Sequence, residues 1–319
     1  AHAELAAHIA SSALADDARD LRNYTVHDSA GRARYEMDAQ GFVIGKLYDG
    51  VGRLTVFRRY LSLTGPSADL RARMLAGTAT TQDILAGLPP ISGQVREVRN
   101  HYDAGGRLRY VLTSHDASSN AVLERRYDNA GRVIEEIAYG VTIPINASST
   151  LSATAAAVAA AGGASASNQH QTRYVYDIAG RLRFAIDDAG AVVERRYDGM
   201  GRTIDLRQYG AVIPTSTAAT EAAVAAAVAG QTDVRSTRTA YDGAGRVLSV
   251  TDALNKVEAY TYDSLGQVKT YTNKNGHSWD CSYDAAGRRV SQTAPAVWVA
   301  TVDNAGNQTP PSSYARGSI

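Results

Sequence analysis

The sequence predicts a mainly β protein, an array of β-hairpins with short Ala-rich helical inserts between pairs of hairpins. Three observations lead to this prediction. A Tyr-Asp-x-x-Gly-Arg-aliphatic motif recurs along the 319-residue chain, several copies lie 21 residues apart, and apolar and polar residues alternate on either side of them. A fixed period of about 20 residues is typical of repeat architectures, and alternation with a period of two is typical of strands.

The motif has eight clear copies, flanked by worn copies at His27 and Val302. The spacing of 21 residues separates His27 from Tyr48 and Tyr176 from Tyr197, and it recurs twice near the end of the chain. We expect the residues of the clear copies to form the structural repeat. They are Tyr48, Asp49, Gly52, Arg53, Tyr102, Asp103, Gly106, Arg107, Tyr127, Asp128, Gly131, Arg132, Tyr176, Asp177, Gly180, Arg181, Tyr197, Asp198, Gly201, Arg202, Tyr241, Asp242, Gly245, Arg246, Tyr262, Asp263, Gly266, Tyr283, Asp284, Gly287 and Arg288.

The Asp-x-x-Gly part of each copy predicts a tight turn. Asp accepts hydrogen bonds from nearby backbone amides in a type I turn, and Gly adopts the left-handed conformation that follows. A second turn is predicted midway between motifs, at 38–41, 187–190 and 273–276. Two turns in 21 residues leave strands of about six residues, an ordinary strand length.

The Tyr and Arg of the motif predict contacts between hairpins. Tyr recurs once per repeat, so we expect tyrosines to stack in rows across neighbouring hairpins. The Arg after the Gly is placed to pair with the Asp of its own or the next repeat. Such exposed pairs contribute little individually, although a ladder of them can help to fix the register.

Helical inserts are predicted at about 3–20, 67–87, 148–162 and 215–230, within a single array that covers residues 1–319 of a longer protein. The later three follow a proline, begin near Ser or Thr and end at Gly, as helix caps do. Two interpretations stay open: surface decoration on tolerant loops, or helices that pack. Because short Ala-rich helices are marginal alone in water, ordered ones need a cover from the sheet, a neighbouring insert or another molecule.

The composition disfavours several classes of protein. A formal net charge of +1 without basic runs argues against nucleic-acid binding. One cysteine excludes an internal disulfide framework, and no apolar run is long enough for a membrane span. The 18 Tyr outnumber 3 Phe and 2 Trp, which favours extended sheet surfaces over a thick core.

The residue pattern predicts no enzyme: no catalytic, cofactor-binding or metal-binding residues are expected. Asp187 and Asp188 adjoin, but neighbours on a strand point to opposite faces and turn aspartates already act as caps. The seven His have no metal-ligand spacing, and Cys281 lies alone on an expected strand.

These motif copies resemble the RHS or YD repeats of bacterial polymorphic toxins, of insecticidal toxin complex shell subunits and of teneurin ectodomains. The resemblance runs from about His27 to Asn307. It implies a strip of hairpins that spirals into a hollow shell around cargo, a bacterial protein that is secreted or displayed at the cell surface, and partners in further repeats, identical subunits or an enclosed toxin domain. The segment with which many such shells close and cleave themselves is not found here.

We therefore expect a non-enzymatic structural scaffold, the wall of a YD-repeat shell that encloses cargo. Two alternatives stay open. An array that does not close could extend as an extracellular filament or tube with the inserts as lateral contacts. Rows of exposed Tyr beside Arg could instead form a carbohydrate-binding adhesion surface that recognises surface glycans.

Overall fold

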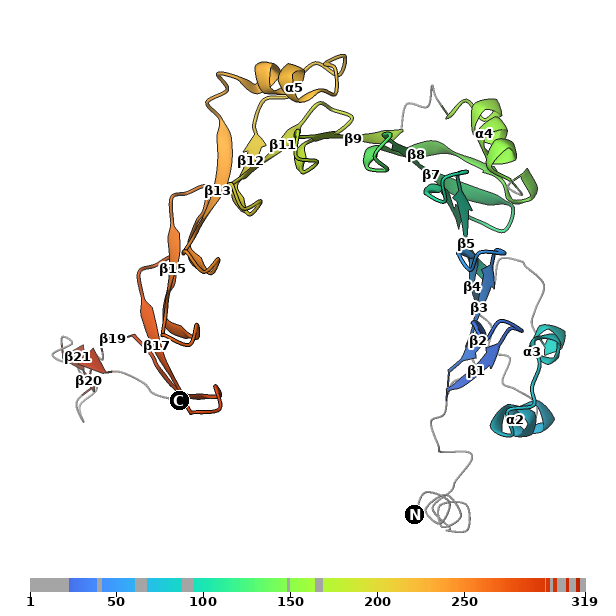
Figure 1. The fold of residues 1–319 in the computed structure, drawn as a ribbon, viewed down its shortest axis with the longest axis horizontal. Helices are drawn as coiled ribbons and strands as arrows, with labels where there is room; N and C mark the ends of the chain where they lie inside the picture. Colours follow the sequence, from blue (N-terminus) through green and yellow to red (C-terminus); the bar gives the residue numbers. More distant parts are fainter. Residues whose placement is uncertain are drawn as a thin grey trace, which may run out of the picture. The chain divides into compact units, whose positions relative to one another are not determined.

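The computed structural model describes residues 23–38, 42–60, 68–87, 95–147, 150–163, 169–295 and four two-residue strands beyond them. By its internal contacts the chain divides into two units, residues 1–171 and 172–319, and each is presented by itself. In both units antiparallel strands dominate, so the mainly β hairpin array predicted from the sequence is confirmed (Figure 1).

The first unit is a ladder in which each strand pairs antiparallel with the next one in the chain. Its strands are β1 (Tyr24–His27), β2 (Ala33–Met37), β3 (Val43–Tyr48), β4 (Leu54–Tyr60), β5 (Val95–Tyr102), β6 (Leu108–Ser114), β7 (Ser119–Tyr127) and β8 (Val133–Pro144).

The second unit repeats this arrangement from strand β9, again in chain order. Its strands are β9 (His170–Tyr176), β10 (Leu182–Ile186), β11 (Val192–Tyr197), β12 (Thr203–Tyr209), β13 (Val234–Tyr241), β14 (Val247–Thr251), β15 (Val257–Tyr262), β16 (Val268–Thr272), β17 (Ser278–Tyr283) and β18 (Arg289–Thr293). Two short ladders follow, β19 (Val297–Trp298) with β22 (Tyr314–Ala315) and β20 (Thr301–Val302) with β21 (Gln308–Thr309).

The motif Tyr marks an irregularity in the register of the ladder. Between Arg196 and Tyr197 the pairing shifts, so that Arg196 lies opposite Asp205 and Tyr197 opposite Thr203. The same shift occurs at the motif Tyr of β3, β5, β7, β13, β15 and β17. One extra residue on the second strand is the bulge that follows a type I turn with a left-handed Gly, and it increases the local twist.

Helices α2 (Ala68–Leu75) and α3 (Thr81–Gly87) lie within the first described insert, and α4 (Leu151–Ala160) and α5 (Glu221–Val228) lie within the next two. A short 3₁₀ turn, η1 (Ile145–Ala147), precedes α4. Thr150 and Thr220 cap α4 and α5 by accepting hydrogen bonds from the amides of Ala153 and Ala223. The insert expected at 3–20 lies outside the described residues.

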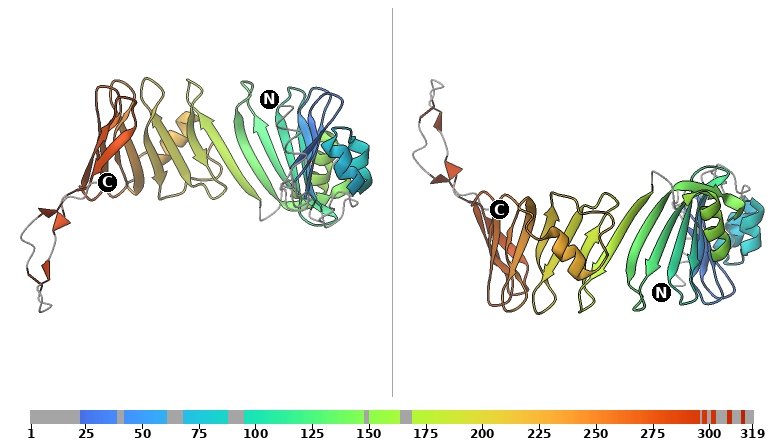
Figure 2. Two further views of the ribbon diagram at one scale, coloured as in Figure 1. Left: turned by 90° about the horizontal axis from the view of Figure 1, so that it is seen from below. Right: turned by 90° about the horizontal axis from the view of Figure 1, so that it is seen from above.

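Each described insert contributes apolar side chains to a core that it shares with the adjacent hairpins. Ile84 joins a cluster formed by strands β1 to β5, and Val158 joins one formed by β6 to β8. In the second unit Val224 and Val228 of α5 pack with Phe184 and Ile186. Figure 2 shows α5 lying across the strands of its own unit. The cover that these helices require is therefore the sheet itself.

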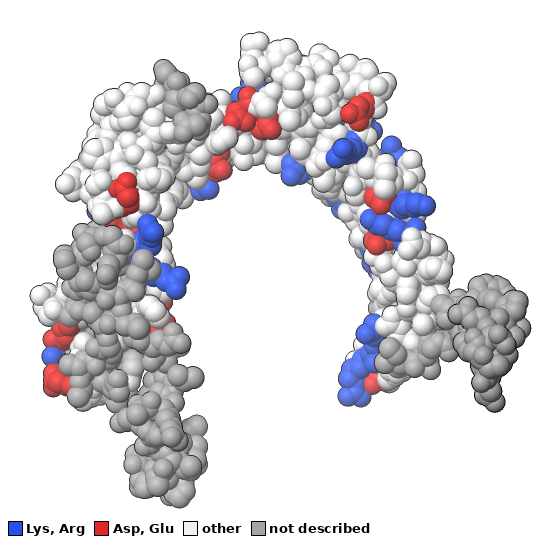
Figure 3. Space-filling view, turned by 180° about the vertical axis from the view of Figure 1, so that it is seen from behind, with Lys and Arg blue, Asp and Glu red and all other residues white. Residues whose placement is uncertain are grey.

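The described surface mixes charges of both signs. Figure 3 shows basic and acidic side chains next to one another on the face in view. Among the helices described above, none is long and apolar enough to cross a membrane.

Candidate functional site

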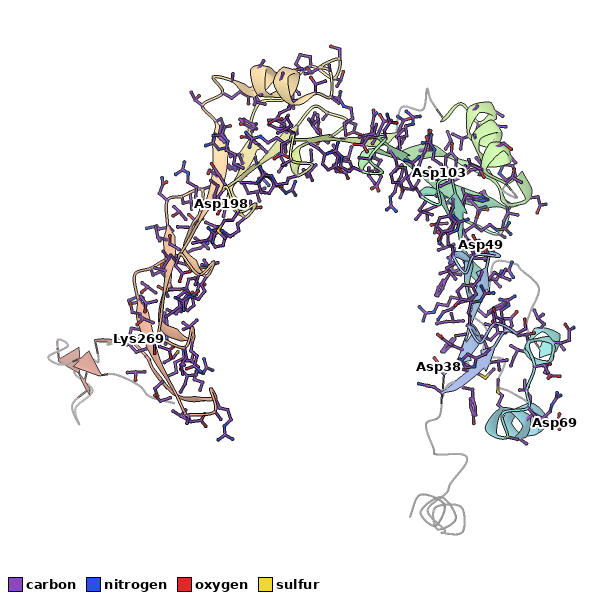
Figure 4. The ribbon with its side chains drawn as sticks, in the orientation of Figure 1. Asp38, Asp49, Asp69, Asp103, Asp198 and Lys269 are labelled. Carbon is purple, nitrogen blue, oxygen red and sulfur yellow. The ribbon has the colours of Figure 1, made fainter. Side chains whose placement is uncertain are left out.

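Each of the eight clear motif copies folds into the same turn, for which Asp198 serves as the example. Its Oδ1 accepts hydrogen bonds from the amides of Met200 and Arg202, both at 2.9 Å. The amide of Gly201 donates to the carbonyl oxygen of Asp198, and φ of Gly201 is +83°, the left-handed region that Gly adopts without a Cβ clash. Figure 4 labels three of these aspartates, Asp49, Asp103 and Asp198.

The second carboxylate oxygen of the motif Asp holds the motif Arg. Arg202 Nε donates to Oδ2 of Asp198 at 2.6 Å. The same pair forms at every other clear copy that carries both residues, at 2.7–2.8 Å. Of the two partners that the sequence allowed, the Arg therefore pairs with the Asp of its own repeat.

The same Arg also reaches the next repeat. The Arg202 guanidinium carbon lies 4.5 Å from the ring centre of Tyr241, and its Nη1 donates to the carbonyl oxygen of Asp242 at 3.4 Å. In return the Tyr241 hydroxyl donates to the carbonyl oxygen of Thr203 at 3.1 Å. Arg202 thus joins the carboxylate of one turn to the aromatic ring of the following turn.

We call this chain of contacts the Arg–Tyr relay. It comprises the pairs Arg32–Tyr48, Arg53–Tyr102, Arg107–Tyr127, Arg181–Tyr197, Arg202–Tyr241 and Arg246–Tyr262, with 4.4–5.0 Å from guanidinium carbon to ring centre. A cation over an aromatic ring contributes about 0.5–2 kcal/mol, depending on exposure.

The relay corrects one expectation, that the motif tyrosines stack on each other. From β15 to β17 the rings that contact each other are Tyr260–Tyr271 and Tyr271–Trp279, and none of these residues is a motif Tyr. Motif tyrosines lie on every second strand, and two strand spacings of about 4.8 Å place the rings too far apart to touch. The guanidinium group of a motif Arg lies against the rings of Tyr197 and Tyr241 instead.

Hydrogen bonds within the turn lower the pKa of Asp198 and Asp242. For Asp198 and Asp242 the main cause is the hydrogen bond from the backbone amide of the motif Arg, followed among the lowering causes by the bond from its guanidinium. Both interactions favour the charged carboxylate. The relay is therefore fully formed when these aspartates are ionised.

Buried glutamates form a second set of polar contacts, which the sequence analysis missed. Glu194 is 1% exposed and binds Arg183 at 2.7 Å, Arg196 at 3.0 Å and the Tyr209 hydroxyl at 2.7 Å. Glu124 occupies the same place in the first unit, with Arg109 at 2.5 Å and the hydroxyls of Tyr110 and Tyr139. The repeated letters Glu-Arg-Arg-Tyr at 124–127 and 194–197 were the available sign.

Glu97 is a third buried carboxylate, 2% exposed, paired with Arg58 at 2.5 Å and with Arg99. Burial alone would raise its pKa, but the hydrogen bonds from Arg99 and Arg58 outweigh that effect and lower it. These three carboxylates are paired with arginines, and none lines one of the described cavities.

Asp187 and Cys281, two other residues weighed for chemistry, lie on different hairpins. Asp187 caps the turn before β11 by accepting from the amide of Ala191 at 2.7 Å. Cys281 is half-buried on β17 opposite Gln292. Across the described segments, no group of three or more His, Cys, Asp or Glu side chains is placed to hold a metal ion.

Fold and relay together define a repeat scaffold of β-hairpins, most of them joined by the same side-chain contacts. The family model described as RHS Repeat matches residues 241–278 and 262–296, so this part of the chain consists of RHS repeats and the resemblance seen in the motif is confirmed there. No curated protein matches the chain.

Solved structures similar to the chain share little sequence with it. The crystal structure of TcdB2-TccC3-TEV is 13% identical over 88% of this chain, with a TM-score of 0.31, and the chain spans 16% of its length. A Tc holotoxin pore of Photorhabdus luminescens is 12% identical over 92% of this chain and 18% of its own, with a TM-score of 0.26. A porin-like protein from Bacteroides uniformis is 11% identical over 93% of this chain and 92% of its own, with a TM-score of 0.25.

Proposed function

We propose that the chain is a wall segment of an RHS-repeat shell that encloses cargo, and that it carries no catalytic activity of its own. The observation that supports this role is that Arg–Tyr contacts also form between the two repeats that flank an insert. Arg53 contacts Tyr102 although the first insert separates them, and Arg202 contacts Tyr241 around the insert that contains α5. The hairpin ladder of each unit therefore continues while the inserts remain outside it.

A ladder of this kind suits a wall better than a catalytic centre. The recurring charged side chains form ion pairs within the ladder. Motif aspartates pair with motif arginines, and buried glutamates pair with further arginines. Recurring junctions allow more repeats to be added through the same kind of contact, because each repeat needs only its neighbour. Further repeats of the same polypeptide or identical subunits are the partners that this geometry favours, with a toxin domain as the enclosed cargo.

The proposal places the protein outside the bacterial cytoplasm, secreted or at the cell surface, as the resemblance to RHS shells implies. Electron microscopy of the native full-length protein tests it. Closed hollow particles with internal density are expected. Open tubes or fibres would contradict the shell and would favour the filament, with the inserts as lateral contacts.

Carbohydrate binding is a second candidate, supported by one specific feature. Tyr260, Tyr271 and Trp279 lie side by side on three neighbouring strands, with ring centres 5.3 and 5.7 Å apart. A row of partly exposed aromatic rings can stack against sugar faces. A glycan array tests this function: binding lost in Trp279→Ala without unfolding would support it, and an array with no binding would remove it.

A further inference from the structure

The first unit carries two arginines side by side without an acidic partner. Arg59 on β4 lies directly opposite Arg96 on β5, and both side chains are exposed. On the same strands, Arg58 and Arg99 pair with Glu97. No ion pair joins Arg59 or Arg96 to another residue that the structure describes. Like charges directly opposite each other destabilise a ladder, so an anion between these two side chains would be stabilising.

The two arginines lie on the face of the sheet that is turned away from the core. Their neighbours Tyr60 and Val95 are buried in the cluster that Ile84 of α3 joins. Successive residues of a strand point to opposite faces, so the side chains of Arg59 and Arg96 point away from that cluster.

A cavity of about 450 Å³ opens beside Arg59. Phe42, Ile44 and Phe57 line it, and its further lining residues extend across β2 to β1. Four neighbouring strands, with spacings of about 4.8 Å, make this lining roughly 14 Å long. A space of this shape suits a linear apolar chain better than a compact ring system.

The acidic residues of the lining lie away from the arginine pair. Glu36 pairs with Lys46 at 2.5 Å. Asp38, labelled in Figure 4, accepts a hydrogen bond from the amide of Phe42 at 2.9 Å. Along the ladder Ile44 separates Glu36 from Arg59. The positive charge without an acidic partner is therefore confined to the β4 end of the cavity.

The second unit has the same row of positions with different residues. In the first unit the row is Thr25, Glu36, Ile44, Arg59 and Arg96, each opposite the next. In the second unit the row is Tyr174, Ala185, Val193, Gln208 and Arg235. A Gln thus replaces one arginine of the pair, and the small Thr25, which lines the cavity, is replaced by the bulkier Tyr174.

We propose that this cavity binds a fatty acid, an alkyl chain that ends in a carboxylate. The carboxylate would lie between the guanidinium groups of Arg59 and Arg96, which bind carboxylates through paired N–H donors. The chain would cover Ile44 and Phe57, apolar side chains that the fold leaves only half-buried. The site lies within the first unit and is independent of the proposed shell.

Titration of the full chain with octanoate and with 1-octanol tests recognition of the carboxylate. Both probes have the same chain length, but only octanoate carries the anion. With labelled Ile methyl groups observed by NMR, we expect the Ile44 signal to shift and octanoate to bind about tenfold more tightly than octanol. Equal affinities would overturn the proposal, because the arginine pair would then play no part.

Arg59→Gln is the matched variant, because it recreates the pair that Gln208 and Arg235 form in the second unit. It should weaken octanoate binding about tenfold and leave octanol binding unchanged. Arg235→Gln removes an arginine from the equivalent row of the second unit and should change neither affinity. Undiminished binding of octanoate by Arg59→Gln would contradict the assignment.

Thr25→Tyr tests the cavity itself. It introduces the side chain that Tyr174 has at the equivalent position, and the thermal transition verifies that the fold is retained. The ring should fill the space and prevent binding of octanoate and octanol alike. An Ile44 shift that persists in the folded variant would place the ligand elsewhere and would also overturn the proposal.

Discussion

The hydroxyl of Tyr209 donates a hydrogen bond to Oε2 of Glu194 at 2.7 Å, in a core covered by α5. Glu194 is 1% exposed and is neutralised by Arg183 and Arg196. Burial is the main cause that raises the pKa of Tyr209, and the hydrogen bond to Glu194 raises it further. The phenol therefore remains a donor throughout the neutral range.

Tyr209→Phe should lower the free energy of unfolding by about 1–3 kcal/mol, because a buried carboxylate loses one of its donors while its other charges stay in place. Urea-induced unfolding followed by circular dichroism measures this loss.

Tyr35→Phe is the matched control. Tyr35 is 2% exposed, and its hydroxyl has no hydrogen-bond partner among the described residues. Tyr35 lies opposite Gly45 in the ladder, whereas Tyr110 and Phe184 lie opposite Glu124 and Glu194. Tyr35 therefore has no buried glutamate across from it, and its equivalent in the second unit is already a Phe. Removing this hydroxyl should leave stability unchanged or raise it by about 1 kcal/mol. A loss as large as that of Tyr209→Phe would contradict the role assigned to the glutamate.

Gly190 links a hairpin turn to an insert. Its carbonyl oxygen accepts from the amide of Ile213 at 2.9 Å, and a Cβ at Gly190 would lie 2.1 Å from the carbonyl oxygen of Ile213. Gly276 has a similar φ, +78° against +86°, but a Cβ there would meet nothing within 4 Å.

Gly276→Ala should therefore cost only the left-handed strain of about 1–2 kcal/mol. Gly190→Ala should cost clearly more, since the backbone of the insert must move. Thermal unfolding of both variants measures the difference, and equal losses would mean that the insert is not held at this turn.

The relay predicts that a motif Arg matters through the following Tyr as well as through its own Asp. Arg246→Gln removes both the pair with Asp242 and the contact with Tyr262, and we expect a loss of about 1–2 kcal/mol in urea unfolding. Within the part of the chain that the structure describes, Arg288 has the pair with Asp284 and no contact with a Tyr ring, and its side chain is 80% exposed. Arg288→Gln should thus change stability by less than about 0.5 kcal/mol, and a similar cost for both variants would remove the Tyr contact from the explanation.

Sequence alone predicted the hairpins because their causes are local. Asp198 caps its turn and Gly201 completes it within four residues, and alternation along the flanking strands is visible in the letters. The role of Arg202 was only half predicted. Its partner Asp198 is four residues away, but Tyr241 lies beyond an insert, and the distance between alternate strands had to be considered to see that an Arg is needed there.

The buried glutamates were missed for a different reason. Glu194 looks like a surface residue beside two arginines, and although the letters Glu-Arg-Arg-Tyr are repeated, they do not show which face of β11 is covered. Only the position of α5 over Phe184 and Val192 makes that face an interior. The same helix answers the question that the sequence left open, namely what covers an Ala-rich insert.

The motif aspartates predict how stability depends on pH. Hydrogen bonds from backbone amides and from the motif Arg hold the pKa of Asp242 and of Asp198 below the ordinary value. A pKa that is lower in the folded state contributes stability above the unfolded value of about 3.9, and this contribution is lost as the pH falls through the folded value. Stability should therefore decrease steeply below about pH 4. Unfolding in urea between about pH 2 and pH 6 measures this slope, and Asp242→Asn should reduce it.

The last prediction concerns whether an insert supports the hairpins beneath it. Val224 of α5 is fully buried, whereas Val212 in the same insert is 59% exposed. Val224→Ala should lower the free energy of unfolding by about 1–3 kcal/mol, because it leaves a gap above Phe184 and Ile186, and Val212→Ala should change it by less than about 0.5 kcal/mol. Hydrogen exchange at the amides of β10 measures whether the hairpin beneath α5 loses stability together with the helix. Faster exchange there in Val224→Ala would mean that helix and hairpins unfold together, while unchanged exchange would mean that the insert opens alone and leaves the ladder intact.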